Sequence, residues 1–311
     1  MSVEIRRMQQ QSDYCRLNQI CVMDKLADAV MITDTKGIIL YINDAFEQIT
    51  GYGRKEVLGQ TPRILKSNRQ NERFYKHLWS TLLHGKPFRE VFINRRKDGA
   101  IYYDEKTITP LKDTNGRVVN FIVIGKDITQ RIRQDERLAK LAYYDSLTGL
   151  PNRMLFYERL LRAMRNSKRN EQLMAVAFLD LDSFKSVNDA YGHFAGDNLL
   201  KSVAHKLQEC VRETDTVARL AGDEFVVLLE GINRMEDVER VLEKILAVFA
   251  YPLRMGTSVQ VVRCSMGVSL FPFADIDPET LVRQADCAMY WAKQEGGRMF
   301  RYFESGMDAG T

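Results

Sequence analysis

The chain has 311 residues, with 45 Lys and Arg against 41 Asp and Glu, so its formal charge is +4 at pH 7. Hydrophobic residues make up 45% and charged residues 28%, which is ordinary for a soluble globular protein and excludes a disordered or collagen-like chain. A domain holds roughly 100–200 residues, so the length predicts about two domains. The near-neutral charge argues against a dedicated nucleic-acid binder, which needs a concentrated basic surface.

Targeting and redox features predict a cytoplasmic protein. The five cysteines form no CxxC pair and no zinc-ligand spacing, a pattern typical of reduced thiols. The chain turns polar directly after its first residues, so no apolar signal region is expected. No apolar run approaches the ~20 residues that cross a membrane, and we expect no membrane partner.

The first half of the chain mixes strands and helices. Residues 1–20 are polar and predict a helix or tail. Strands at 30–34 and 38–42 flank a turn and predict a hairpin, and short helical pieces follow over 46–58. Residues 73–83 have apolar rows at helical spacing. Strands at 88–94, 101–110 and 118–126 complete a small antiparallel sheet with helices against one face.

A charged helical connector is predicted over residues 127–144, and the pattern then becomes that of an α/β domain. Strands are expected at 174–180, 216–220, 225–229 and 259–270. Helices are expected at 198–211, 235–249 and 278–294. The first of these strands is an almost continuous apolar run, which is typical of a buried strand.

Three carboxylates mark this second domain. Asp180 ends the buried strand, and Asp223 and Glu224 lie at the tip of a tight hairpin. Strand ends and hairpin tips lie at the rim of a sheet, where carboxylates can converge on a hard cation such as Mg²⁺. Taken alone, the acidic turn at Asp223 and Glu224 favours the interpretation that it is an ordinary solvated loop.

The neighbouring residues favour a nucleotide site. A carboxylate, backbone amides and Lys185 at the start of a helix form a suitable cradle for a metal-bound triphosphate. Glycines over residues 191–197 allow close approach of a ligand, and Asp197 could pair with the edge of a base.

These motifs together resemble the GGDEF family of diguanylate cyclases. They are DxDxFKxxND at 180–189, YGHxxGD at 191–197 and AGDEF at 221–225, preceded by DxLTGLxNR at 145–153 and followed by AxYxAK at 288–293. The resemblance implies a palm-like α/β domain that condenses two GTP molecules into cyclic di-GMP and two pyrophosphates. It also implies a homodimer, because each protomer holds one GTP.

The resemblance further implies a role for each matching residue. Two Mg²⁺ ions would be held by Asp180, Asp223, Glu224 and the carbonyl of Leu181, with Asp180, Asp223, Glu224 and Lys185 as the catalytic set. Asn188 and Asp197 would read guanine, and Asp197 favours GTP over ATP. The full set of implied substrate contacts is Ser183, Phe184, Lys185, Asn188, Asp197, Ala221, Gly222, Lys293 and Arg298.

Two positions depart from the family pattern. Ala221 replaces the first glycine of the signature, which is tolerable only if its φ is negative. Gly297 occupies the usual place of an arginine, which leaves the phosphate role of Arg298 open. These departures motivate an alternative, a catalytically silent receptor for GTP or cyclic di-GMP.

Arg212 and Asp215 stand at the family's RxxD offset before the signature. The resemblance implies an inhibitory site for the cyclic di-GMP product, which arginine can bind through phosphate or a guanine edge. Arg240 is the expected third member. The competing interpretation is an ordinary charged helix end.

The N-terminal half resembles the PAS family of sensor domains. The resemblance rests on residues 38–46, 50–52, 56–59 and 94–99, and on the Asp-Ile-Thr exit at 127–129. The expected organisation is a tail over 1–20, a PAS domain over 21–127, a signalling helix over 128–144, a GGDEF domain over 145–305 and a tail over 306–311. The expected fold class is therefore a two-domain α+β chain.

The ligand of the PAS domain is open at this point. Similarity to flavin-holding PAS domains makes FAD one hypothesis, with Asn94, Phe88 and Trp79 as the contacts. Phe88 and Trp79 are equally compatible with a core role. Haem is a weaker alternative and would need His77 or His84 as an axial ligand.

Overall fold

A computed structural model describes residues 22–182, 184–250, 253–255, 258–260, 262–272 and 276–307. Ser183 and the predicted tail over residues 1–20 lie outside them. The chain divides into two compact units that meet between Glu136 and Arg137, inside helix α5 (Thr129–Tyr143).

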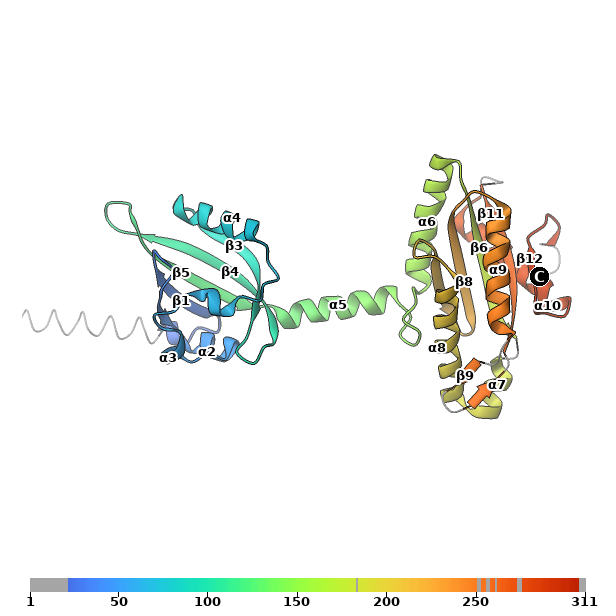
Figure 1. Cartoon of the computed structure of the whole chain (residues 1–311), viewed down its shortest axis with the longest axis horizontal. Helices are drawn as coiled ribbons and strands as arrows, with labels where there is room; N and C mark the ends of the chain where they lie inside the picture. Colours follow the sequence, from blue (N-terminus) through green and yellow to red (C-terminus); the bar gives the residue numbers. More distant parts are fainter. Residues whose placement is uncertain are drawn as a thin grey trace, which may run out of the picture. The chain divides into compact units, whose positions relative to one another are not determined.

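The N-terminal unit is built on a five-stranded antiparallel sheet in the order β2-β1-β5-β4-β3 (Figure 1). The predicted hairpin, helix and three-stranded meander are confirmed, in a two-domain α+β chain. Its strands are β1 (Ala29–Asp34), β2 (Ile39–Ile42), β3 (Phe88–Arg95), β4 (Ile101–Lys112) and β5 (Val118–Asp127). Its helices are α2 (Asp44–Thr50), α3 (Arg54–Val57), the 3-10 helix η1 (Pro62–Leu65) and α4 (Glu72–Leu83).

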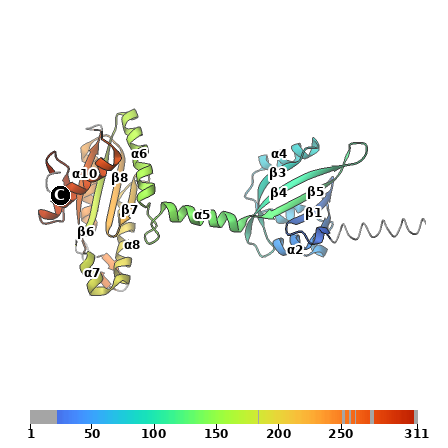
Figure 2. The same ribbon diagram turned by 180° about the vertical axis from the view of Figure 1, so that it is seen from behind.

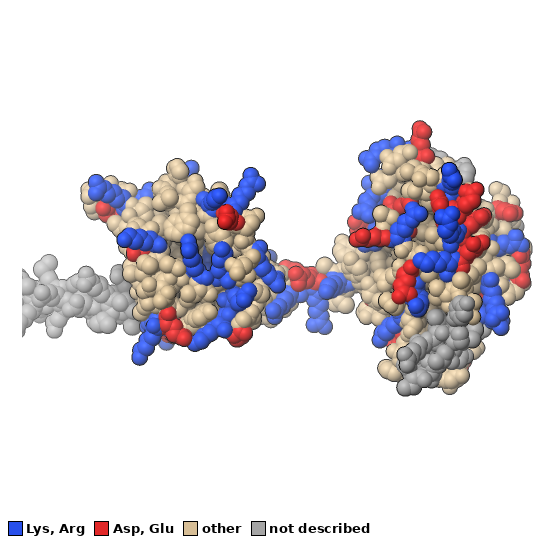
Figure 3. All heavy atoms as spheres, viewed as in Figure 1, with Lys and Arg blue, Asp and Glu red and all other residues tan. Residues whose placement is uncertain are grey.

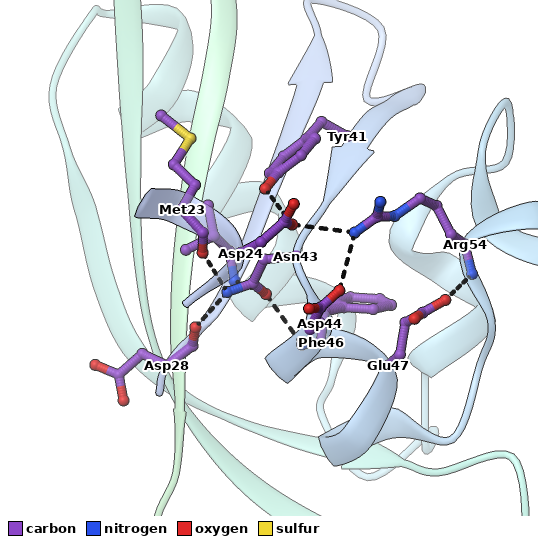
Figure 4. A network of polar contacts seen from close by, with 10 residues as sticks. Met23, Asp24, Asp28, Tyr41, Asn43, Asp44, Phe46, Glu47 and Arg54 are labelled. Carbon is purple, nitrogen blue, oxygen red and sulfur yellow. Dashed lines mark hydrogen bonds and ion pairs between the residues drawn. The ribbon is translucent and has the colours of Figure 1, made fainter. Parts of the chain in front are cut away.

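Asn43 joins the segment before β1 to the sheet and to α2 (Figure 4). Its buried side-chain oxygen accepts hydrogen bonds from the backbone N–H groups of Val30 (2.8 Å) and Phe46 (3.0 Å), and the second bond caps α2. Its amide group donates to the carbonyls of Met23 (3.1 Å) and Asp28 (2.9 Å). Because all of these groups are largely removed from water, Asn43 is a rigid junction of the domain.

A second set of contacts in Figure 4 surrounds Asp24. Its carboxylate accepts from the Tyr41 hydroxyl at 2.8 Å and pairs with Arg54 at 3.1 Å. Burial and the hydrogen bond to Asp24 raise the pKa of Tyr41 to about 12. Arg54 also contacts Asp44 at 3.3 Å, so the segment before β1 is tied to β2, α2 and α3.

The end of β5 is linked to the start of α5. Asp127 accepts a hydrogen bond from the Thr129 backbone N–H at 2.9 Å and pairs with Arg96. Burial opposes its ionisation, but hydrogen bonds from Thr129 and the Arg96 guanidinium hold the pKa of Asp127 below its usual value. The Thr129 hydroxyl in turn accepts from the Tyr103 N–H at 2.9 Å. The first turn of α5 is thereby held to β4.

The C-terminal unit contains a five-stranded sheet in the order β12-β11-β6-β8-β7, antiparallel except for the β11–β12 pair. Its strands are β6 (Leu173–Asp182), β7 (Thr216–Ala221), β8 (Glu224–Ile232), β11 (Arg263–Phe271) and β12 (Phe300–Tyr302). Its helices are α6 (Arg153–Asn170), α7 (Phe184–Tyr191), α8 (His193–Cys210), α9 (Met235–Phe249) and α10 (Pro278–Gln294).

Four elements of this unit differ from the prediction. Helix α6, strand β12 and the short strand β9 (Leu253–Met255) were not predicted, although the buried residues of α6 recur at helical spacing. The single strand predicted over 259–270 is divided between β11 and a short strand β10 (Ser258–Gln260), which pairs with β9.

Helices cover both faces of this sheet (Figures 1 and 2). Alternate residues of β6 point to opposite faces, as expected for a strand. Ala175, Ala177 and Leu179 pack in one cluster with α8 and α9. Met174, Val176 and Phe178 pack in a second cluster with α6 and α10. None of the described helices of the protein is long and apolar enough to cross a membrane.

Candidate functional site

The register of the sheet brings Asp180 and Glu224 together. They are paired directly across β6 and β8. On β6, Asp180 lies two positions after Phe178 and so points to the same face of the sheet as Phe178 and Val176. On β8, Glu224 lies two positions before Val226 and shares its face. Both carboxylates therefore lie on the face covered by α6 and α10, at the end of their strands, where they are half-buried.

The hairpin between β7 and β8 holds Asp223 beside them. Ala221 pairs with Glu224, so Gly222 and Asp223 form a two-residue turn. Gly222 has φ +45°, a conformation that L side chains rarely adopt, whereas Ala221 does not have a positive φ. The alanine in the signature is therefore compatible with the turn.

Helix α10 supplies two further charged residues, Asp286 and Lys293, which are seven positions apart. Seven residues are two helical turns, so both lie on one side of the helix. The Lys293 Nζ lies 2.6 Å from the Asp180 Oδ1. A Cβ placed on Gly267 of β11 would lie 2.0 Å from the backbone of Ala285 and of Met289. Only glycine permits α10 to approach the sheet so closely.

The carboxylates of this cluster disfavour one another's ionisation. Burial and the charge of Asp180 raise the pKa of Asp223. Burial and the charges of Asp286, Asp180 and Asp223 raise the pKa of Glu224. Desolvation and the charge of Asp180 also raise the pKa of Asp286, which the sequence reasoning missed. The sequence feature that could have identified Asp286 is its spacing of seven residues from Lys293, which places both on one side of the helix.

The donor set suits a hard divalent cation. No group of three or more His, Cys, Asp or Glu side chains in the described part of the chain is arranged so that it could hold a metal ion. Mg²⁺ does not need such a group, because it keeps several waters and takes one or two carboxylates together with substrate phosphates. A bound cation would reduce the electrostatic repulsion between the carboxylates of Asp180, Asp223 and Glu224.

Helices α7 and α8 place Asn188, one of the two residues expected to read a base, against the residue that precedes the other, Asp197. A Cβ on Gly196 would lie 2.0 Å from the Asn188 Oδ1, so Asn188 packs directly over Gly196, which is adjacent to Asp197. Phe184 begins α7 and packs against the core. Lys185 is exposed in the same first turn. The glycine of the YGHxxGD motif thus makes room for Asn188.

The segment after α10 contains Gly297 and Arg298, at which the chain departs from the family pattern. Gly297 has φ +70°, and a Cβ there would lie 3.0 Å from the Asp182 Oδ2. Asp182 also accepts a hydrogen bond from the Ser265 hydroxyl at 2.9 Å. Arg298 is exposed and has φ +58°. Gly297 is therefore the residue that lies close to the Asp182 carboxylate, whereas the next residue, Arg298, is exposed to solvent.

Arg219 connects the hairpin between β7 and β8 to the start of the domain. Its Nη1 lies 2.9 Å from the Asp145 Oδ1, and its Nε donates to the Gly222 carbonyl at 2.8 Å. The two side chains are only 12% and 22% exposed. Burial opposes the ionisation of Asp145, but hydrogen bonds from Thr148 and the Arg219 guanidinium lower its pKa. Asp145 belongs to the DxLTGLxNR motif, whereas Arg219 was not singled out from the sequence.

Arg212 and Asp215 line a cavity of about 320 Å³. The Asp215 carboxylate accepts from the backbone N–H groups of Arg212 (2.9 Å) and Glu230 (3.2 Å). Arg240 is not among the residues that line this cavity, and it pairs instead with Asp237 at 3.3 Å. Arg159, which was not predicted, does line it.

The N-terminal unit contains a larger cavity of about 910 Å³. Of the expected ligand contacts, Asn94 and Trp79 line it, whereas Phe88 is buried among the aromatic rings of Phe74, Phe92 and His77. Neither His77 nor His84 lines the cavity, so neither is placed to ligate a haem there.

Two family models match the chain. The model described as "Diguanylate cyclase, GGDEF domain" matches residues 142–299, and the model of the PAS fold matches residues 21–128. The solved GGDEF domain of PA1120 (TpbB or YfiN) from Pseudomonas aeruginosa is 39% identical, with a TM-score of 0.52, over 53% of this chain and 97% of that one. The coiled coil and GGDEF domain of DgcB from Caulobacter crescentus, in complex with c-di-GMP, is 26% identical, with a TM-score of 0.51, over 56% and 92%.

Similar curated proteins have different activities in their names. The diguanylate cyclase TpbB of Pseudomonas aeruginosa is 42% identical over 65% of this chain and 47% of that protein. The cyclic di-GMP phosphodiesterase PdeR of Escherichia coli is 32% identical over 92% of this chain and 43% of that protein. This chain thus spans less than half the length of these two relatives. Residues 142–299 make up half of it, and the chain belongs to the GGDEF diguanylate cyclase family, with a PAS domain before the GGDEF domain.

Proposed function

We propose that the protein is a diguanylate cyclase that converts two GTP molecules into cyclic di-GMP and two pyrophosphates. The observation that carries the proposal is the convergence of Asp180, Asp223 and Glu224 with Lys293 at one sheet edge of a GGDEF domain. In each of two bond-forming steps, the 3′-hydroxyl of one GTP attacks the α-phosphate of the other and pyrophosphate leaves. Two facing protomers, each holding one GTP, would make the reaction symmetric.

The residues of the chain divide the work as follows. Lys293 and Lys185 offset the charge of the triphosphate, and Asn188 with Asp197 receives the guanine edge. Glu224 would accept the proton of the attacking hydroxyl, and its raised pKa supports this role because it brings the carboxylate closer to the working pH. Ser183, Phe184 and Gly222 are proposed as further substrate contacts by their positions in the family motifs.

Mg²⁺ fits the same set. Asp180, Asp223, Glu224 and the Leu181 carbonyl would hold two Mg²⁺ ions, which would supply charge neutralisation at the transferring phosphate. Asp180, which contacts Lys293, would help to hold the cations, and Lys293 would then be available to phosphate.

The test is direct. The purified full chain is incubated with GTP and MgCl₂, and the products are identified by mass spectrometry. We expect cyclic di-GMP and pyrophosphate in a 1:2 ratio from the chain, and none from Glu224→Gln. Glu304→Gln, on an exposed segment away from the cluster, is the matched control and should retain activity. GTP that remains unconverted over a range of protein concentrations would overturn the proposal.

The alternative is a silent receptor for GTP or cyclic di-GMP. Gly297 in the usual position of an arginine, together with the similarity to a protein named as a phosphodiesterase, favours it. Saturable nucleotide binding without turnover would distinguish the receptor from the enzyme.

We also propose that the cavity beside Arg212 and Asp215 binds the product and inhibits the enzyme. Arg212→Ala should relieve inhibition by added cyclic di-GMP. Arg159 lines the cavity and Arg240 does not, so Arg159→Ala should weaken inhibition more than Arg240→Ala. Equal inhibition of all variants would contradict the assignment.

The PAS domain is proposed to regulate the cyclase through a bound ligand, in a protein of the cytoplasm. FAD is one hypothesis, and the volume of the cavity with Asn94 and Trp79 in its lining supports it. An absorption spectrum of the purified protein, with flavin release on denaturation, tests it. A colourless preparation that takes up no added FAD would exclude FAD.

A further inference from the structure

One member of a buried ion pair, Lys106, lines the cavity of the N-terminal unit. Lys106 and Asp104 lie two positions apart on β4, so both point to the inner face of the sheet. The Lys106 Nζ lies 3.2 Å from the Asp104 Oδ2, and the two side chains are only 9% and 6% exposed. Lys106 and Asn94 line the cavity. A charge held this far from water needs a specific reason, because its burial costs several kcal/mol.

The hydrogen bonds of the pair are incomplete. Asp104 Oδ2 accepts from Asn94 Nδ2 at 3.2 Å as well as contacting Lys106. A lysine ammonium has three hydrogen-bond donors, and within the described residues the Lys106 ammonium forms an ion pair with one carboxylate, that of Asp104. The Nζ also lies 5.1 Å from the centre of the Phe92 ring. Lys106 therefore retains hydrogen-bonding capacity on the side of the cavity.

The rest of the lining is basic at its exposed positions. Lys36, Arg63, Lys66 and Lys76 line the cavity, and Glu72 is the one acidic residue among the lining residues of the described chain. Glu72 pairs with Lys76 at 3.9 Å, so it does not offset the others. Residues 22–128 as a whole contain 18 Lys and Arg against 13 Asp and Glu, a surplus of five. Basic side chains are accordingly spread over the face of this unit in Figure 3.

The remaining wall is apolar and aromatic. It is formed by side chains from the sheet and from α4, namely Met31, Tyr75, Leu78, Trp79, Leu82, Phe92, Ile108, Phe121 and Val123. The cavity of about 910 Å³ lies within the size range of sites for small organic ligands. Its chemistry selects a molecule with an apolar body and a negative head.

We propose that this cavity binds an organic anion, a flat or aliphatic body carrying a carboxylate or phosphate, whose charged group pairs with Lys106. Asn94 supplies the second polar contact from β3, and the basic rim attracts the ligand and disfavours cations. The low polarity around Lys106 makes its contact with an anion stronger than a surface contact. The inference deepens the ligand-binding role proposed for the PAS domain. Its test measures binding alone, so it can fail while cyclase activity stands.

The experiment is isothermal titration of the full chain with two matched pairs of probes. FMN and riboflavin share one ring system and differ by the phosphate. Indole-3-acetate and indole-3-acetamide share one shape and differ by the charge. We expect the anion of at least one pair to bind about tenfold or more tighter than its neutral partner, the effect of a single charged hydrogen bond. Preference within the flavin pair identifies a phosphate ligand, and preference within the indole pair identifies a carboxylate ligand.

Variants separate the charge from the fold. Lys106→Met should abolish the preference for the anion. The double variant Lys106→Met/Asp104→Asn removes both charges and avoids an uncompensated carboxylate, and it should show the same loss. Lys126→Met, at an exposed position of β5 outside the lining, is the control and should bind as the parent does. Equal affinity within both pairs, no binding of any probe, or an undiminished preference in the double variant would overturn the proposal.

Discussion

Replacing Arg219 by alanine tests whether this residue holds the hairpin between β7 and β8 in place. The change removes the contact with Asp145 at 2.9 Å and the hydrogen bond to the Gly222 carbonyl at 2.8 Å. Hydrogen bonds to charged groups contribute about 1.5–3 kcal/mol each, and partial exposure reduces the sum to about 2–3 kcal/mol. In a domain of this size that lowers Tm by roughly 5–10 °C. Calorimetric unfolding of the full chain measures it.

Two variants serve as comparisons. Arg219→Lys keeps a positive charge near Asp145 but loses the planar guanidinium, which donates to Asp145 and to the Gly222 carbonyl at once. We therefore expect a Tm between those of the parent and Arg219→Ala. Arg301→Ala removes an exposed pair with Glu295 and should shift Tm by no more than about 2 °C. If Arg219→Ala unfolds at the same temperature as Arg301→Ala, the hairpin does not depend on Arg219. The kcat for GTP should fall in parallel, because Asp223 follows Gly222 directly.

The same contact predicts a pH dependence with a definite sign. The pKa of Asp145 is lowered in the folded chain, so its contribution to stability is complete above the unfolded pKa of about 3.9. The contribution is lost as the pH falls through the lower folded pKa. The difference in Tm between the parent and Arg219→Ala should therefore narrow below about pH 4. A difference that stays constant down to pH 2.5 would refute the role of the ion pair.

Three further changes probe the site. Gly267→Ala places a methyl group against the backbone of α10, so we expect a loss of about 1–3 kcal/mol in unfolding free energy and reduced GTP turnover; unchanged calorimetry would contradict this. Gly196→Ala displaces the Asn188 amide and should raise KM for GTP more than it lowers kcat, and an unaltered KM in steady-state kinetics would count against guanine reading by Asn188. Glu224→Gln removes repulsion and should raise Tm in EDTA while reducing the increase caused by Mg²⁺ with GTP; a lower Tm in EDTA would show that the repulsion is unimportant.

Local pattern alone predicted most of the elements and the family. The alternation of apolar residues and the Gly-containing turns identified every strand of the two five-stranded sheets except β12, since side-chain direction in a strand depends only on the parity of the position. The ordered motifs identified Asp180, Asp223 and Glu224 in the same way. Helix α6 was not predicted, although its buried residues recur at helical spacing and its sequence therefore does contain a helical pattern.

The partners of these residues depended on tertiary structure. Asp286 reaches the cluster because Gly267 lets α10 lie against the sheet, and that contact joins positions about twenty residues apart. Arg159, and not the predicted Arg240, lines the cavity with Arg212 and Asp215 because α6 packs beside β7, whereas Arg240 is held on α9 by Asp237. The net charge of +4 gave no indication that Lys106 is buried beside Asp104. Sequence determines which side a residue faces, and only packing between distant segments decides what that side meets.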